Sequence, residues 1–112
     1  SDTDTYEILN KVRESTSLVP IVNENCFLNS FSHIFSGGYA AGYYSYKWAE
    51  VLAADAYEHV KENGGIGSKA SNDFRKCILE VGGSLDFMEQ YIKFRGSRPK
   101  IDGLLKASGI SI

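Results

Sequence analysis

Hydrophobic residues recur at helical spacing along most of the 112-residue chain, and no long stretch alternates cleanly between apolar and polar positions. Near the N-terminal end, Tyr6, Leu9 and Val12 follow one another at intervals of three residues, behind possible helix caps at residues 2–4. This pattern predicts a first helix that ends near residues 15–17.

The central part of the chain has the strongest helical pattern. Residues 18–25 place a β-branched pair among proline and asparagine, which indicates an extended connection. A glycine inside a helix costs about 1 kcal/mol relative to alanine, so Gly37-Gly38 argue against one continuous helix. We therefore expect a short helical piece around residues 30–36 and a long helix over about 39–62. The aromatic stripe across both consists of Phe27, Phe31, Phe35, Tyr39 and Tyr43.

The C-terminal third predicts three shorter helices, after Asn63-Gly64-Gly65 ends the long one. Ser84 is a candidate cap for the second of them, Gly96 a terminator, and Pro99 suits the first turn of the last. The first of the three is marked by Phe74, Cys77, Ile78 and Val81. The expected fold is all-α, with about five helices, one long central helix and a single domain over residues 1–112.

Composition and charge exclude several classes of protein. A net charge of -2 with 12% aromatic residues is atypical of disorder, and the charge is not basic enough to suggest a nucleic-acid partner. The acidic start of the chain lacks the order of a signal peptide. The uncharged residues 25–46 are too polar for a membrane span. Cys26 and Cys77 lack C-x-x-C spacing, so we expect buried, reduced thiols in a cytoplasmic protein, with an organelle not excluded.

Aromatic residues are unevenly distributed. The uncharged residues 25–46 hold seven of the fourteen aromatic side chains. Such a segment must be covered by the rest of this chain, by a copy of it, or by a part of the protein absent here. We therefore expect the isolated chain to expose apolar surface and to self-associate.

Most patterns that could carry chemistry have a simpler explanation. His33 and His59 are 26 residues apart without an H-E-x-x-H motif, which predicts no metal site in this chain. The glycine-rich residues 64–69 lack Walker order and suit a flexible link between helices. Ser32-His33 lack the setting of a catalytic triad. A basic run is most simply a solvated helix end: Lys93, Arg95, Arg98 and Lys100.

The tyrosines are the remaining candidates. On a helix from residue 39, Tyr39, Tyr43 and Tyr46 would share one face, while Tyr44 and Trp48 would lie on an adjacent face suited to packing. A tyrosine stripe is more often core than chemistry, although phenylalanine would pack without needing a partner for each hydroxyl. A phenol with its ordinary pKa of about 10 stays protonated at neutral pH and can donate to a developing oxyanion. Packing and function therefore both remain open from spacing alone.

A resemblance decides between them. The run Phe31-Ser-His-Ile-Phe-Ser-Gly-Gly-Tyr-Ala-Ala-Gly-Tyr-Tyr-Ser-Tyr-Lys-Trp48, continuing to Ala56, closely resembles the C-terminal part of zinc metallopeptidases of the oligopeptidase A and thimet oligopeptidase family. The tail from Gly82 through Leu105 is similar to that family's tail, and the likeness covers about residues 8–110. It implies a largely helical enzyme whose two halves enclose a channel for short peptides, with zinc held by an H-E-x-x-H motif and a downstream glutamate.

The resemblance also implies roles for particular residues. His33 would contact the substrate or the tetrahedral intermediate, and Gly37-Gly38 would shape the substrate-binding loop. Tyr39, Tyr43 and Tyr46 would bind the peptide backbone. Among them, Tyr46 is the best candidate to stabilise the oxyanion, with Tyr39 or His33 assisting.

The sequence departs from the family in three places. The zinc motif is missing, so we expect a chain that binds no metal and is inactive without the zinc-bearing N-terminal portion of its parent. Lys47 stands where an apolar residue is usual, and Ser97 where the tail usually has arginine. The alternative is a free-standing helical module that binds peptides or a partner without catalysis. Neither interpretation implies a nucleic-acid or membrane partner.

Overall fold

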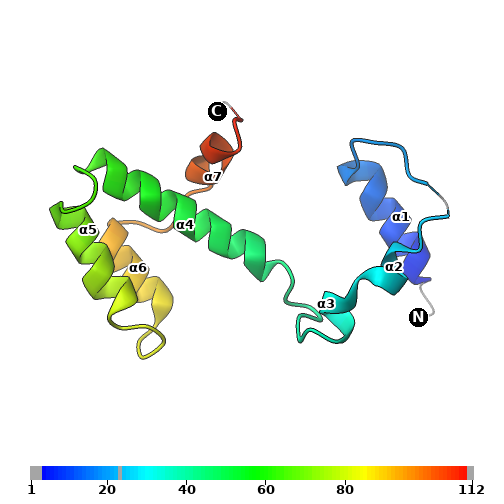
Figure 1. The fold of residues 1–112 in the computed structure, drawn as a ribbon, viewed down its shortest axis with the longest axis horizontal. Helices are drawn as coiled ribbons and strands as arrows, with labels where there is room; N and C mark the ends of the chain where they lie inside the picture. Colours follow the sequence, from blue (N-terminus) through cyan, green and yellow to red (C-terminus); the bar gives the residue numbers. More distant parts are fainter. Residues whose placement is uncertain (1–3, 23, 111–112) are drawn as a thin grey trace. The chain divides into compact units, whose positions relative to one another are not determined.

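The computed structural model describes residues 4–22 and 24–110, and these residues form seven α-helices, one short π-helix and no strand (Figure 1). The all-α prediction is confirmed. The count exceeds the expected five because the segment after residue 26 makes two separate single turns, α2 (Phe27–Ser30) and α3 (Ser32–Phe35). The chain divides into two compact units, one up to Ala41 and one from Gly42 onward.

The first unit contains α1 (Thr5–Thr16), α2 and α3. Asp4 caps α1, because its side-chain oxygen accepts a hydrogen bond from the Tyr6 amide at 2.9 Å. The Ser17 amide donates to the Arg13 carbonyl at 2.8 Å and closes the helix. The first predicted helix is therefore confirmed at both ends, while the possible caps at residues 2 and 3 lie outside the described residues. None of the described residues of this unit is buried.

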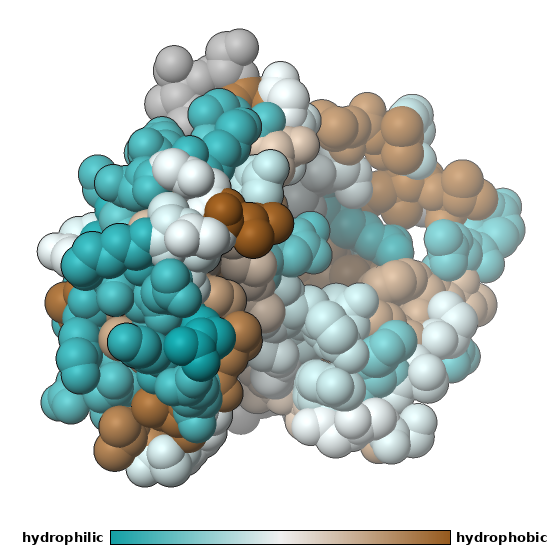
Figure 2. All heavy atoms as spheres, turned by 60° about the vertical axis from the view of Figure 1, so that its left-hand side comes forward, coloured by the Kyte–Doolittle hydropathy of each residue, from teal (hydrophilic) through white to brown (hydrophobic). Residues whose placement is uncertain are grey.

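The second unit is built around the long helix α4 (Ser45–Glu62), which packs against α5 and α7. A π-helical turn extends α5, and α6 packs against both (Figure 1). The remaining elements are α5 (Lys69–Phe74), η1 (Arg75–Leu79), α6 (Phe87–Arg95) and α7 (Asp102–Ala107). The space-filling view of this end shows mainly hydrophilic residues with isolated apolar ones between them (Figure 2).

The core of the second unit is centred on Phe94. Its ring lies 5.2 Å from that of Phe74, 5.1 Å from that of His59 and 5.8 Å from that of Tyr91, each at a steep angle. Such edge-on contacts are a favourable arrangement of aromatic rings. Burial, followed by the nearby Arg95 charge, lowers the pKa of His59, so the core favours its neutral form.

A buried charge lies beside this core. Asp55 of α4 is only 3% exposed, and its carboxylate accepts hydrogen bonds from Tyr91 Oη at 2.7 Å and from Arg95 Nε at 3.1 Å. Arg95 Nη2 also donates to the other carboxylate oxygen at 3.4 Å. A buried carboxylate is tolerated when it is paired and hydrogen-bonded, so these bonds hold α4 to α6. The prediction that Arg95 is solvated is wrong, because its side chain is only 20% exposed.

The long helix begins at Ser45, not at Tyr39 as the sequence predicts. Residues 40–44 form turns instead, in which the Ser45 amide donates to the Gly42 carbonyl at 3.0 Å. Three glycines between residues 37 and 42 explain the shorter helix, because glycine has the greatest conformational freedom to lose. Tyr44 and Trp48, expected to pack, are 71% and 47% exposed.

Three further predictions are wrong: the cap of α6, the position of Pro99 in the last helix, and the burial of Cys26. Asp86, not Ser84, caps α6 by accepting from the Glu89 amide at 2.8 Å, whereas the Ser84 hydroxyl donates to a carbonyl behind it. Pro99 precedes α7, which begins only at Asp102. Cys77 is buried as expected, but Cys26 is exposed.

Several expected helix ends are confirmed. Gly64, with φ +100°, and Gly96, with φ +80°, follow α4 and α6 as left-handed terminators. Residues 64–68 link α4 to α5, where the Ser68 hydroxyl accepts from the Ser71 amide at 3.2 Å.

Lys47, unusual for the resembled family, is exposed and forms an ion pair with Glu50 on the same helix. Among the described residues, no helix is long and apolar enough to cross a membrane.

The crossing of α7 over α4 gives a first prediction. A Cβ atom on Gly103 would lie 2.9 Å from the Ala54 carbonyl carbon and oxygen and 3.0 Å from the Asp55 nitrogen. Backbone atoms cannot move aside as a side chain can, so Gly103→Ala should lower the free energy of unfolding by ~1–3 kcal/mol in urea denaturation. Gly83→Ala, where a Cβ would meet nothing within 4 Å, is the control. Equal stability of the two variants would contradict the close crossing.

The buried hydrogen bond from Tyr91 to Asp55 predicts that the stability of the chain falls at alkaline pH. Burial, and then the hydrogen bond to Asp55, raise the pKa of Tyr91 above its ordinary value. The folded state therefore holds the Tyr91 proton more tightly than the unfolded state does. The stability that this difference contributes is complete below about pH 10 and is lost at higher pH. Urea denaturation between about pH 8 and about pH 11 should show this loss in the native chain and less of it in Tyr91→Phe.

The control for this prediction is Tyr57→Phe. Tyr57 lies on the same helix as Asp55 but is 64% exposed, whereas Tyr91 is 1% exposed. An equal flattening of the pH dependence in both variants would show that the buried phenol is not its cause.

Candidate functional site

The glycine loop after α3 requires glycine at two positions. A Cβ on Gly37 would lie 2.9 Å from the carbonyl oxygen of His33, and Gly38 has φ +74°, which favours glycine. The Tyr39 amide then donates to that same His33 carbonyl at 3.2 Å. The loop therefore turns the backbone tightly and returns Tyr39 to His33.

His33 and Tyr39 are neighbours in space. Their rings lie 6.1 Å apart between centroids, and the Phe31 ring lies 5.8 Å from that of His33 on the preceding turn. The Phe27 ring stacks on Phe31 at 5.2 Å. His33 itself is exposed and Tyr39 is half-buried. The first unit thus brings together two of the candidate residues, beside the two glycines that shape their loop.

Tyr43 and Tyr46 form a second pair, in the other unit. Their rings lie 5.4 Å apart at an interplanar angle of 58°. Tyr43 belongs to the turn before α4, and Tyr46 to its first turn. Both are well exposed, at 42% and 45%.

The sequence prediction of three tyrosines on one face of one helix is wrong in its geometry. Of the three, only Tyr46 lies in α4, because the helix begins at Ser45. Tyr43 reaches Tyr46 from the turn, while Tyr39 is associated with His33. The structure thus places the His33 ring near that of Tyr39, and the Tyr43 ring near that of Tyr46.

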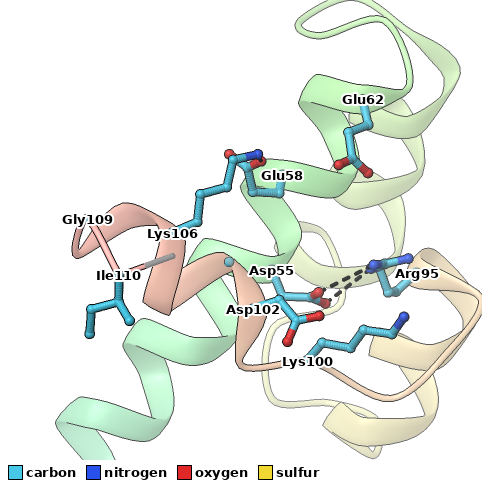
Figure 3. Close-up of a pocket in the computed structure, with 10 residues that line it drawn as sticks. Asp55, Glu58, Glu62, Arg95, Lys100, Asp102, Lys106, Gly109 and Ile110 are labelled. Atoms are coloured by element: carbon cyan, nitrogen blue, oxygen red, sulfur yellow. Dashed lines mark hydrogen bonds and ion pairs between the residues drawn. The ribbon is translucent and has the colours of Figure 1, made fainter. Parts of the chain in front are cut away.

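A polar cleft that sequence reasoning missed lies between α4, α7 and the end of α6 (Figure 3). It encloses about 530 Å³. The Lys106 ammonium lies 2.5 Å from the Glu58 carboxylate, and Arg95 reaches Asp55 in the same cleft. The hydrogen bond between Glu58 and Lys106 lowers the pKa of Glu58 and raises that of Lys106.

The charges in this cleft come from segments that are far apart in the sequence. Asp55, Glu58 and Glu62 share one face of α4 by their spacing, which is the only sequence signal for it. The basic partners of Asp55 and Glu58 come from 40 and 48 residues later in the chain, which spacing cannot reveal. Two of these charges are paired across elements, Asp55 with Arg95 of α6 and Glu58 with Lys106 of α7, so these ion pairs join α4 to α6 and α7.

The side chains described here do not fit a zinc site. Over residues 4–22 and 24–110, no group of three or more histidine, cysteine, aspartate or glutamate side chains is placed to hold a metal ion. A protein zinc site needs at least three such ligands.

Comparison with known proteins gives the family. Probable cytosolic oligopeptidase A of Arabidopsis thaliana is 45% identical over 109 residues, covering 94% of this chain and 16% of that protein. Oligopeptidase A of Salmonella typhimurium is 45% identical over 104 residues, which are 93% of this chain and 15% of that protein. Dipeptidyl carboxypeptidase of Escherichia coli is 40% identical over 111 residues, which are 99% of this chain and 16% of that protein.

The chain thus spans about a sixth of the length of the curated relatives it matches. A sequence profile described as Peptidase family M3 matches residues 1–110. The match includes the glycine loop, the two aromatic pairs and the helix that carries Tyr46. Because the family profile matches residues 1–110 of the 112 residues, this chain belongs to peptidase family M3.

Proposed function

We propose that this chain is the C-terminal, substrate-binding and transition-state-stabilising part of a metalloendopeptidase that hydrolyses short peptides. The observation that carries the proposal is the family match over residues 1–110, which includes all the candidate residues. Two relatives are named oligopeptidases and a third a dipeptidyl carboxypeptidase, and such names describe action on peptides.

Tyr46 is the proposed donor to the oxyanion. Its ring is 45% exposed at the start of a helix whose other half is fixed by the buried Asp55. A phenol keeps its proton at neutral pH, so it can donate a hydrogen bond as negative charge develops on the carbonyl oxygen of the scissile peptide. A donor on a rigid element needs little rearrangement at that moment, which favours the transition state over the bound substrate.

The other candidates have supporting roles in this proposal. Tyr43, whose ring contacts that of Tyr46, would bind the substrate backbone. His33 and Tyr39 would assist the oxyanion donor from the loop that Gly37 and Gly38 shape. A Cβ on Gly38 would meet nothing within 4 Å, so the backbone there is open to an approaching peptide, whereas the His33 carbonyl fills the space beside Gly37.

The metal and the general base are assigned to another part of the parent enzyme. The described residues offer no zinc ligand set. We therefore expect the chain to be inactive on its own, and its proposed partners are short peptides and the zinc-bearing portion. A cytoplasmic location is proposed from the relative named cytosolic, although another relative of Arabidopsis thaliana is named organellar.

A hybrid enzyme tests the role of Tyr46. The matching stretch of Salmonella typhimurium oligopeptidase A, which is 45% identical, is replaced by this chain, and peptide hydrolysis is measured. Tyr46→Phe should lower kcat about 10²–10³-fold with little change in KM, because the lost hydrogen bond forms only in the transition state. The control is Tyr44→Phe, since that neighbouring ring is 71% exposed. Full activity of the Tyr46→Phe hybrid would remove the oxyanion role.

The isolated chain distinguishes the proposal from the alternative of a free-standing binding module. Calorimetric titration with short peptides should give no binding in the micromolar range, and the same peptides should remain uncleaved. A wall that lacks the opposite side of its channel cannot desolvate a peptide on both faces. Micromolar binding without zinc would instead support a module that binds peptides by itself.

A further inference from the structure

Asn63 is the only asparagine of the sequence that directly precedes a glycine. It is the residue after α4, and Gly64 begins the link from α4 to α5 (Figure 1). The backbone nitrogen that follows an asparagine can attack the side-chain amide carbon and close a five-membered ring. A side chain on the following residue obstructs this attack, and glycine has none. The pair Asn63-Gly64 is therefore the one in this chain that is best suited to such a reaction.

The link that contains this pair is open to solvent. Asn63 and Gly64 are exposed, and Ile66, two residues later, is 100% exposed. Gly64, Gly65 and Gly67 all have positive φ angles. Because glycine has the widest choice of backbone conformations, the link can bring the Gly64 nitrogen toward the Asn63 side chain. Water, which the reaction also needs, can reach both residues.

The Gly64 amide is the group that would attack, and no hydrogen bond holds it in place. The Asn63 amide before it donates to the His59 carbonyl at 3.2 Å. The Gly65 amide after it donates to the Val60 carbonyl at 2.8 Å. Among the hydrogen bonds of the described part of the chain, none comes from the Gly64 amide. This nitrogen can therefore lose its proton and turn toward Asn63 without giving up a hydrogen bond of its own.

The side-chain amide of Asn63 stabilises the end of α4. Its Nδ2 atom donates to the His59 carbonyl oxygen at 2.8 Å and lies 3.4 Å from His59 Nδ1. The His59 ring packs against Phe94 in the core, with 5.1 Å between the ring centroids. A carboxylate at position 63 would have no proton to donate to the carbonyl, and negative charge is unfavourable at the C-terminal end of a helix. Conversion of the amide to a carboxylate would therefore replace a stabilising contact with a repulsive one beside the core.

We propose that Asn63 is a site of spontaneous deamidation, and that this modification loosens the C-terminal end of α4. The Gly64 nitrogen loses its proton and bonds to Cγ of Asn63, and the side-chain nitrogen leaves with that proton as ammonia. Water then adds to the cyclic imide and opens it at either of its two carbonyl carbons. One opening gives aspartate and the other gives isoaspartate. The chain and water supply every atom, and the attack is fast for an amide because both groups belong to neighbouring residues.

Isoaspartate would disturb the end of α4 in a second way. Its backbone runs through the former side chain, which adds one carbon between positions 63 and 64. The hydrogen bond from the Gly65 amide to the Val60 carbonyl closes the helix across this point. The added carbon moves this donor away from its acceptor. Aspartate and isoaspartate thus weaken the same helix end by different means.

Asn72 provides a matched control within the same chain. It is also exposed, and its Nδ2 atom likewise donates to a carbonyl four residues earlier, that of Ser68, at 3.0 Å. It lies inside α5, however, and is followed by Asp73, whose side chain obstructs the attack. The two asparagines therefore share their exposure and their type of hydrogen bond, and differ in the residue that follows and in the backbone around them.

Peptide mapping by mass spectrometry of the purified 112-residue chain tests the proposal. The chain is incubated in mildly alkaline buffer, which increases the deprotonated fraction of the Gly64 amide. The peptide that contains Asn63 should gain the mass of water and lose that of ammonia, and an isoaspartyl methyltransferase should then methylate it. The peptide that contains Asn72 should react at least about tenfold more slowly. Equal rates at both positions would overturn the proposal, as would an unreacted Asn63 under conditions in which the guanidinium-unfolded chain reacts.

Two substitutions separate the reaction from its consequence. Asn63→Gln keeps the amide but requires a six-membered ring, so modification at this position should fall at least about tenfold. Asn63→Asp has the product's charge from the start and should lower the melting temperature by about 2–8 °C. Asn72→Asp, close to the N-terminal end of α5 where negative charge is favourable, should lower it less. Modification of Asn63→Gln at the native rate, or native stability of Asn63→Asp, would contradict the proposal.

Discussion

The buried carboxylate of Asp55 is the constraint on which the second unit depends. A charge that is 3% exposed must be compensated, and its partners, Tyr91 and Arg95, both come from α6. Gly103 lets α7 cross α4 within van der Waals distance of the Asp55 backbone. Together these contacts fix the middle of α4 from two sides. Tyr46, at the start of the same helix, is therefore presented on a rigid element.

The first unit is formed mainly by local interactions. It has a good helix cap at Asp4 and a tight glycine loop, but no buried side chain among its described residues. Local interactions of this kind define which helices can form without making them stable.

Local signals explain what was predicted correctly. Asp4, Gly64 and Gly96 act within one helical turn, so the ends that they define could be read from neighbouring residues. The predicted start of α4 was wrong, because the aromatic periodicity continues through three glycines. Periodicity does not reveal that these glycines form turns. Asp86 and Ser84 are both good caps, and only the backbone path chose between them. Arg95 was misjudged because its partner is 40 residues away.

The candidate site shows the same division. The sequence by itself determined the all-α class, the family and the residues to consider, because these depend on residue types and short spacings. Only the tertiary structure decided that His33 pairs with Tyr39 and Tyr43 with Tyr46, on two units of unequal burial. The physical reason is that long-range packing and the pairing of buried charge depend on which segments meet in space. Periodicity along the chain does not contain that information.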